Sequence, residues 1–173
     1  SVGYDMYLQL LEEAVLTERG EPEKIPNQCS ADLTVAASIP DRYVPSPQQR
    51  MDLYRRIALI RSESDADDLT DELIDRYGDP PRPVNNLISV ALLRSEAARC
   101  GITELTQKGN NLVLGLAAFN LQEVSALCGG ERWQGRLLFS PGEKAALTLR
   151  LKKGENPLSL ARTLVGDYAR LQG

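Results

Sequence analysis

The stretch DELIDRYGDPPRPVNNLISVALLRSEAARCGI, residues 71–102, contains the end of one helix, a proline-rich turn and a whole second helix. Gly78 stops the first helix, and the prolines after it can open the second, because proline is tolerated in a first helical turn. Apolar residues then recur at the spacing of one helical face, from Val84 to Leu92. The stretch therefore predicts two consecutive amphipathic helices, the second ending at Cys100 before Gly101.

Toward the N-terminus, the sequence predicts a helix from Pro47 to about Ile60 and another that is capped by Ser64 and ends at Tyr77. Residues 31–39 have the composition of a strand. Residues 20–30 contain two prolines and a glycine and are typical of a linker, and residues 2–19 have helical spacing. We expect residues 1–22 to form a linker helix and residues 23–173 to form the domain itself.

Toward the C-terminus the pattern changes to short strands. The sequence predicts a hairpin from 102–106 and 112–117, a short helix capped by Asn120, two strands at 136–140 and 146–152, and a final helix from Pro157. Helices first and strands later indicate an α+β fold. We expect N-terminal helices followed by a small, mostly antiparallel sheet with a C-terminal helix packed on it.

The composition excludes several kinds of catalytic site. Histidine is absent, which removes Ser-His-Asp triads, Cys-His dyads and histidine metal ligands. The two glycine-rich motifs that bind phosphate groups, GxxxxGK[ST] and GxGxxG, are both absent from the sequence. Cys29, Cys100 and Cys128 are far apart in the sequence, as is typical of reduced thiols in a cytosol. No run of apolar residues approaches the length that is needed to span a membrane. We expect a cytoplasmic, non-catalytic chain without a cofactor, a bound metal or a membrane partner.

The segment ESDADDLTDELIDRYGD, residues 63–79, carries eight acids and one base, Arg76. On a helix its apolar residues share one side, and the opposite side holds Asp68, Asp71, Glu72 and Asp75. Neighbouring acids on a helix repel each other, and no second base in the segment offsets this. Two interpretations stay open: a solvated helix face, or a surface that binds a basic partner.

The basic residues gather in the last part of the chain. Residues 1–80 hold 17 acids and 8 bases, whereas residues 131–173 hold 4 acids and 8 bases. The relevant bases are Arg132, Arg136, Arg150, Lys152 and Lys153, with Trp133 beside the first. Bases next to an aromatic residue can bind nucleic acid by stacking. The simpler interpretation places Arg150 and Lys152 on the exposed face of an edge strand.

Three sequence segments follow one another in a recognisable order. They are VGYDMYLQLLEEAV (2–15), IPDRYVPSPQQRMDLYRRIA (39–58) and the opening stretch, 71–102. The first resembles the segment that closes the translocation motif of the bacterial transcription-repair coupling factor family. The other two resemble the C-terminal domain of that family. The resemblance covers residues 2–102, and from 103 to 173 only position and length match.

The resemblance implies a function for the whole protein and a role for this part of it. The family's full-length proteins are ATP-driven DNA translocases that release stalled RNA polymerase and recruit the excision-repair protein UvrA. ATP belongs to upstream motor domains, RNA polymerase and DNA bind other domains, and residues 1–22 would end the translocase element. This chain would be an autoinhibitory domain that docks on a UvrB-like module, masks UvrA binding and restrains the motor.

The resemblance also assigns site residues. The acids of the family's ELIDR[FY]G motif contribute to docking, and they correspond to Glu72 and Asp75 here. The helical pattern adds Asp68 and Asp71 to the same face. The alternative function remains an accessory nucleic-acid-binding domain that uses the basic C-terminal third.

Overall fold

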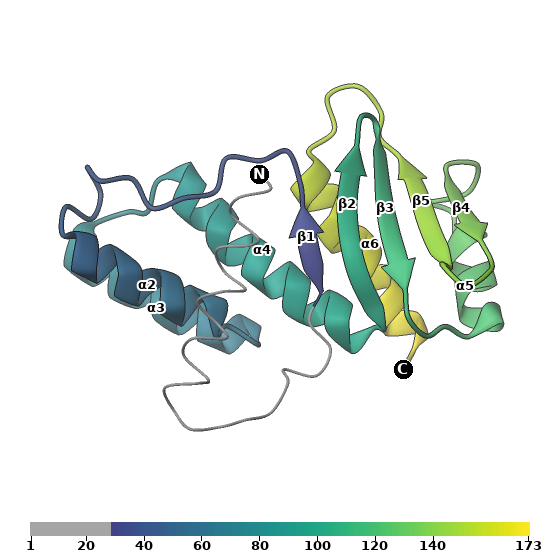
Figure 1. Cartoon of the computed structure of the whole chain (residues 1–173), viewed down its shortest axis with the longest axis horizontal. Helices are drawn as coiled ribbons and strands as arrows, with labels where there is room; N and C mark the ends of the chain where they lie inside the picture. The colour runs from purple at the N-terminus through teal and green to yellow at the C-terminus, as the bar shows by residue number, and fades with distance from the viewer. Residues whose placement is uncertain (1–28) are drawn as a thin grey trace. The chain divides into compact units, whose positions relative to one another are not determined.

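The computed structural model describes residues 29–173, which divide into two compact units. We call residues 35–95 the helical unit, and residues 29–34 with 96–173 the sheet unit. Figure 1 shows the elements of each unit. The helix expected at 2–19 and the boundary expected after residue 22 lie outside the described residues.

The helical unit contains α2 (Pro47–Ala58), α3 (Glu63–Tyr77) and most of α4 (Arg82–Arg99). The Ser46 hydroxyl caps α2 as predicted, accepting from the Gln49 N–H at 3.3 Å. The cap expected at Ser64 is wrong by two residues. Ser62 caps α3 instead and accepts from the Asp65 N–H at 3.1 Å, so Ser64 lies within the first turn.

The apolar stripes of α3 and α4 form the core of the helical unit. Leu73 and Leu87 are 1% and 0% exposed, and Leu92, the least buried member of the α4 stripe, is 8% exposed. Ala66, Leu69, Val84, Ile88 and Ala91 of the predicted stripes are buried too, and Tyr77 at the end of α3 is half-buried. Helical periodicity therefore identified the core face of both helices correctly.

The sheet unit contains five strands in the order β1-β2-β3-β5-β4. The strands are β1 (Ser30–Asp32), β2 (Ile102–Lys108), β3 (Asn111–Leu116), β4 (Leu137–Ser140) and β5 (Ala146–Arg150). Only the pairing of β1 with β2 is parallel; the other pairs are antiparallel. The helices of this unit are α5 (Leu121–Cys128) and α6 (Pro157–Leu171).

Alternating side chains give the sheet one buried face. On β3 and β5 the buried positions are Leu112, Leu114, Leu116, Leu147 and Leu149. Figure 1 shows α6 (yellow) lying behind the strands, and this helix buries Leu158, Ala161, Leu164, Val165 and Tyr168. The expected α+β architecture, with a mostly antiparallel sheet and a C-terminal helix packed on it, is confirmed.

The strand expected at residues 31–39 is much shorter than predicted, because only Ser30–Asp32 pair with β2. The chain then passes into the helical unit at residue 35. There the backbone bonds to helices instead of a strand: Ser38 N–H donates to the Pro83 carbonyl, and Ile39 N–H donates to the Tyr54 hydroxyl. Apolar composition alone could not distinguish this extended crossing from a strand.

The edge position expected for the strand at 146–152 is also wrong. β5 lies between β3 and β4 and ends at Arg150, so Lys152 belongs to the following loop. An interior strand has no free backbone edge. Arg150 and Lys152 are therefore exposed for a reason other than membership of an edge strand.

Gly101 makes the tight passage from α4 into β2 possible. Its φ is +85°, and a Cβ at this position would lie 2.9 Å from the Ala118 carbonyl oxygen. The Gly101 carbonyl accepts from the Ala117 N–H at 3.0 Å. Any other residue would bring both an unfavourable φ and a close contact, so glycine serves here as helix stop and as packing surface.

Candidate protein-binding face of helix α3

Helix α3 exposes a row of acids that have no ionic partner within the described residues. Asp68, Asp71 and Asp75 are all exposed, and none forms an ion pair there. They occupy the side of the helix opposite the buried Leu69 and Leu73. The structure thus places three of the four predicted site residues together on one free surface, which we call the acidic face.

Ile74 adds an apolar side chain beside these acids. It follows Asp71 by three positions, precedes Asp75 by one, and is 42% exposed. A branched aliphatic side chain left in water between charged neighbours loses the free energy that burial would give. A basic surface of complementary charge could pair with this row of acids and cover Ile74 beside them.

Glu72, the fourth predicted residue, is in a different environment. Both of its carboxylate oxygens accept hydrogen bonds from the Arg56 guanidinium of α2, one of them at 3.2 Å. Arg76 Nη1 lies 3.5 Å away on the same helix. Hydrogen bonding from Arg56 is the main cause that lowers the pKa of Glu72 below its ordinary value. Glu72 therefore links α3 to α2 within the helical unit.

Two tyrosines fix the C-terminal end of α3 and the acidic face with it. The Tyr43 hydroxyl donates to the Gly78 carbonyl at 2.8 Å, and its ring lies 5.7 Å from the ring of Tyr77. The Tyr77 hydroxyl donates to the Gln49 side chain at 3.0 Å. Partial burial raises the pKa of Tyr43 above its ordinary value, which favours the protonated hydroxyl that donates here.

Sequence reasoning missed the roles of Arg56 and Tyr43. Both lie outside the acidic segment, and periodicity within a helix does not say which side chain of another element meets it. The Arg56–Glu72 contact joins residues 16 positions apart. A regular local spacing could not have indicated this pair.

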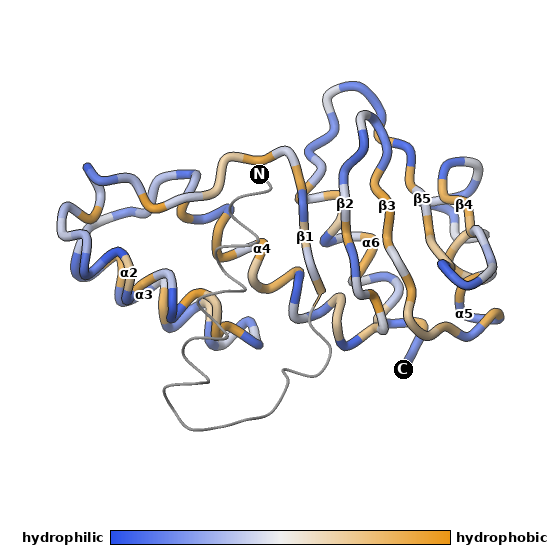
Figure 2. The backbone as a smooth tube through the Cα atoms, viewed as in Figure 1, coloured by the Kyte–Doolittle hydropathy of each residue, from blue (hydrophilic) through white to orange (hydrophobic). Residues whose placement is uncertain are grey.

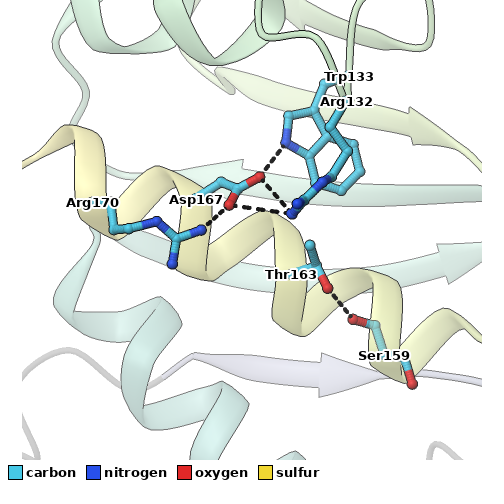
Figure 3. A network of polar contacts seen from close by, with 6 residues as sticks. All are labelled: Arg132, Trp133, Ser159, Thr163, Asp167 and Arg170. Atoms are coloured by element: carbon cyan, nitrogen blue, oxygen red, sulfur yellow. Dashed lines mark hydrogen bonds and ion pairs between the residues drawn. The ribbon is translucent and has the colours of Figure 1, made fainter.

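The structure divides the basic residues of the C-terminal third into paired and unpaired groups. The indole N–H of Trp133 donates to Asp167 at 2.8 Å, and Arg132 pairs with the same carboxylate at 3.2 Å. Figure 3 shows both side chains and Arg170 converging on Asp167. Trp133 is 1% exposed, so it has no free ring face for a nucleic-acid base.

Arg136 is also committed to an internal contact. It pairs with both oxygens of Glu155 and donates to the Arg150 carbonyl at 2.6 Å and 3.1 Å. Hydrogen bonding from Arg136 is the main cause that lowers the pKa of Glu155. Within residues 29–173, the bases of the predicted set without an ion pair are therefore Arg150, Lys152 and Lys153, although Glu155 also attracts Lys152.

The described residues offer no metal site and no membrane-crossing helix. Within residues 29–173, no group of three or more Cys, Asp or Glu side chains could hold a metal ion. No helix in this range is long and apolar enough to cross a membrane. The acidic face is thus an exposed protein surface without an associated metal cluster in this part of the chain.

Sequence comparison finds relatives along nearly the whole chain. Residues 33–126 match the TRCF domain family. The transcription-repair-coupling factor of Myxococcus xanthus is 32% identical over 170 residues, which cover 97% of this chain and 14% of that protein. The corresponding protein of Staphylococcus haemolyticus strain JCSC1435 is 28% identical over 165 residues, covering 94% of this chain and 13% of that protein. The chain thus spans a small part of the length of these relatives.

A solved structure shares the fold. The crystal structure of the C-terminal domain of a transcription-repair coupling factor superposes with a TM-score of 0.73 at 18% sequence identity. The match covers 86% of this chain and 96% of that one. At this identity the likeness establishes the arrangement of helices and strands, including the part after residue 103 where no sequence motif was recognised.

Proposed function

The chain belongs to the TRCF domain family, and we propose that it is the autoinhibitory C-terminal domain of a transcription-repair coupling factor. In this role the acidic face of α3 docks on a UvrB-like module of the same protein. Docking masks the surface that binds UvrA and restrains the upstream motor. ATP hydrolysis, DNA translocation and contact with RNA polymerase belong to other domains, and this chain is non-catalytic.

The observation that carries this proposal is the acidic face itself. Asp68, Asp71 and Asp75 are exposed and unpaired within the described residues, and Ile74 is exposed beside them. A basic partner surface would relieve the repulsion among the acids, and it would bury Ile74. Charge complementarity of this kind directs which surface binds and speeds the encounter.

Glu72 has a separate part in the proposal. Its bonds to Arg56 fix α3 against α2, so the helix presents its acids from a rigid position. A preformed surface loses little conformational freedom on binding, which strengthens docking. Glu72 therefore supports the docking face, and Asp71 and Asp75 provide its free charge.

The decisive experiment reverses the free charges and leaves Glu72 in place. In the full-length protein, Asp71→Lys/Asp75→Lys should weaken docking by about tenfold or more, since repulsion replaces attraction at the contact. Resting ATPase activity and UvrA capture should both rise, because each depends on the undocked state. The two readouts should rise together. Because the variant has lost the charge attraction at the contact, both readouts should vary less with salt concentration than they do in the wild type.

Glu143→Lys is the matched control. Glu143 is an exposed acid of the sheet unit without an ion pair among the described residues, so the same type of charge reversal there should change neither readout. Circular dichroism of each variant must show the wild-type fold. Wild-type ATPase activity and UvrA capture in a folded Asp71→Lys/Asp75→Lys protein would reject the docking role.

A further inference from the structure

A second charged surface lies at one end of the sheet, where the β2–β3 turn meets the loop after β5. Lys108, Asn111 and Arg150 are paired in register across three neighbouring strands. The Leu151 N–H donates to the Asn110 carbonyl at 2.6 Å, which holds the loop against the turn. Figure 1 shows the turn and the loop together at this end, and Figure 2 shows that their residues are mainly hydrophilic.

The surface is hollowed and strongly positive. A depression of about 510 Å³ is lined by Asn110, Gly135, Arg136, Arg150, Leu151, Lys152 and Lys153. Glu155 pairs with Arg136, the only lining base with an ion pair among the described residues, and it also attracts the charge of Lys152. Arg150, Lys152 and Lys153 are exposed, and Lys108 adds a fourth exposed cation on β2, two strands away from β5. We call these four residues the cationic end.

Concentrating these charges is unfavourable unless an anion compensates them. Strands lie about 4.8 Å apart, so Lys108 and Arg150, two strands apart, are roughly 10 Å from each other at the backbone. This is comparable to the Debye length at 0.1 M salt, about 10 Å, so the cations repel each other in the free protein. A ligand with several regularly spaced negative charges would relieve that repulsion.

The residues that line the depression indicate which kind of polyanion it fits, an acidic protein or a nucleic acid. Leu151 is its one apolar residue and is only partly exposed, whereas a protein-binding surface usually has an apolar centre. The lining contains no aromatic residue on which a base could stack. What remains is Arg and Lys side chains with one Asn amide, which are the usual donors to phosphate oxygens.

We propose that the cationic end binds the phosphodiester backbone of nucleic acid without sequence preference. Each cation displaces counterions from the phosphates, and so binding should be moderate and strongly dependent on salt. The role is separate from docking by α3, because the two surfaces lie in different units of the chain.

The test measures binding of the 173-residue chain to a fluorescein-labelled mixed-sequence DNA duplex by fluorescence anisotropy. Three to four cations predict a slope of log K against log salt of about −2.7 to −3.6. For a slope of about −2.7, affinity should fall about 40-fold between 50 and 200 mM NaCl. A second duplex of unrelated sequence should bind equally well.

Charge-removing variants locate the site. Arg150→Gln/Lys152→Gln/Lys153→Gln should abolish measurable binding, and Lys153→Gln alone should make the slope less steep by about 0.9. Lys144→Gln is the matched control, because Lys144 is exposed and precedes β5 at the opposite end of that strand. It should retain wild-type affinity at 200 mM NaCl, and circular dichroism should confirm the fold of each variant.

Two further ligands identify the chemistry. Single-stranded RNA that binds about as tightly as the duplex would assign the site to the phosphate backbone in general, and a preference for the duplex would assign it to double-stranded DNA. Tighter binding of poly-glutamate than of either nucleic acid would overturn the proposal in favour of an acidic protein partner. Absence of duplex binding at 50 mM NaCl, or wild-type binding by the folded triple variant, would also overturn it.

Discussion

Leu73 and Ile74 are adjacent on α3 and have opposite environments. Leu73 is 1% exposed and packs in the core of the helical unit, whereas Ile74 is 42% exposed on the acidic face. Leu73→Ala should lower the free energy of unfolding by about 2–5 kcal/mol, the usual range for a fully buried leucine. Ile74→Ala should lower it by less than about 1 kcal/mol. Urea unfolding of the two variants measures both values, and similar losses would contradict the assigned orientation of α3.

Single residues also show how far the sequence was informative. The burial of Leu73 followed from helical spacing, because the positions that share a face are fixed by the geometry of one helix. The hydrogen bonds of Glu72 did not follow, since its partner Arg56 belongs to another helix. The position of Trp133 beside a base left stacking as one interpretation, and its environment did not follow from the sequence. The ring is buried, and Asp167, 34 positions away, accepts its indole N–H.

At the scale of elements, the Arg56–Glu72 contact makes the packing of α2 on α3 dependent on pH. Arg56 lowers the pKa of Glu72 from its ordinary 4.5, so the folded state releases this proton more readily than the unfolded state. The stabilisation is therefore complete above pH 4.5 and is lost as pH falls through the folded-state pKa. Compared with Glu72→Gln, the wild type should be more stable at pH 6 and lose that advantage toward pH 3.

The measurement is chemical unfolding of both proteins from pH 7 to pH 3 at low ionic strength, where screening is weakest. Asp75→Asn serves as control, because it removes an acid of the same helix that no ion pair holds within the described residues. This variant should keep the pH-dependent advantage over Glu72→Gln. A wild-type advantage that is unchanged at pH 3 would show that the contact does not stabilise the fold.

The elements themselves differ in how much the sequence revealed. Asn120 and Asn156 cap α5 and α6, each accepting from backbone N–H groups within the next three residues. Caps are local, and the sequence at such positions is sufficient to place a helix start. The length of the strand expected at 31–39 depended instead on where the chain leaves β2, which continues for two residues beyond the partner of Asp32. That point is set by long-range contacts that composition does not encode.

For the whole molecule, the sequence correctly indicated the α+β class and the separation of charge along the chain. It did not indicate the two compact units, because their boundary falls within the continuous helix α4, between Ser95 and Glu96. It also did not indicate the strand order, since β5 is inserted between β3 and β4. For the candidate site, it placed Asp68, Asp71 and Asp75 on one face and treated Glu72 as their equivalent.

The parallel pairing of β1 with β2 has a consequence for the order of folding. Residues 33–101, including the helical unit, separate these neighbouring strands, whereas the turn between β2 and β3 needs only Gly109 and Asn110. Closing a flexible connection of this length would cost about 4 kcal/mol in chain entropy, and β1 has only three paired residues to hold it in the sheet. We therefore expect β1 to join the sheet late and to detach first.

Hydrogen exchange followed by mass spectrometry measures this difference. Backbone amides of residues 29–34 should exchange well before those of β3, which is paired on both sides. Equal protection of the two segments would show that β1 opens only when the whole sheet unfolds. In the expected case the protein briefly exposes the free edge of β2, whose unpaired N–H and C=O groups can accept a strand from another chain. The first aggregation of a destabilised variant should then begin at β2.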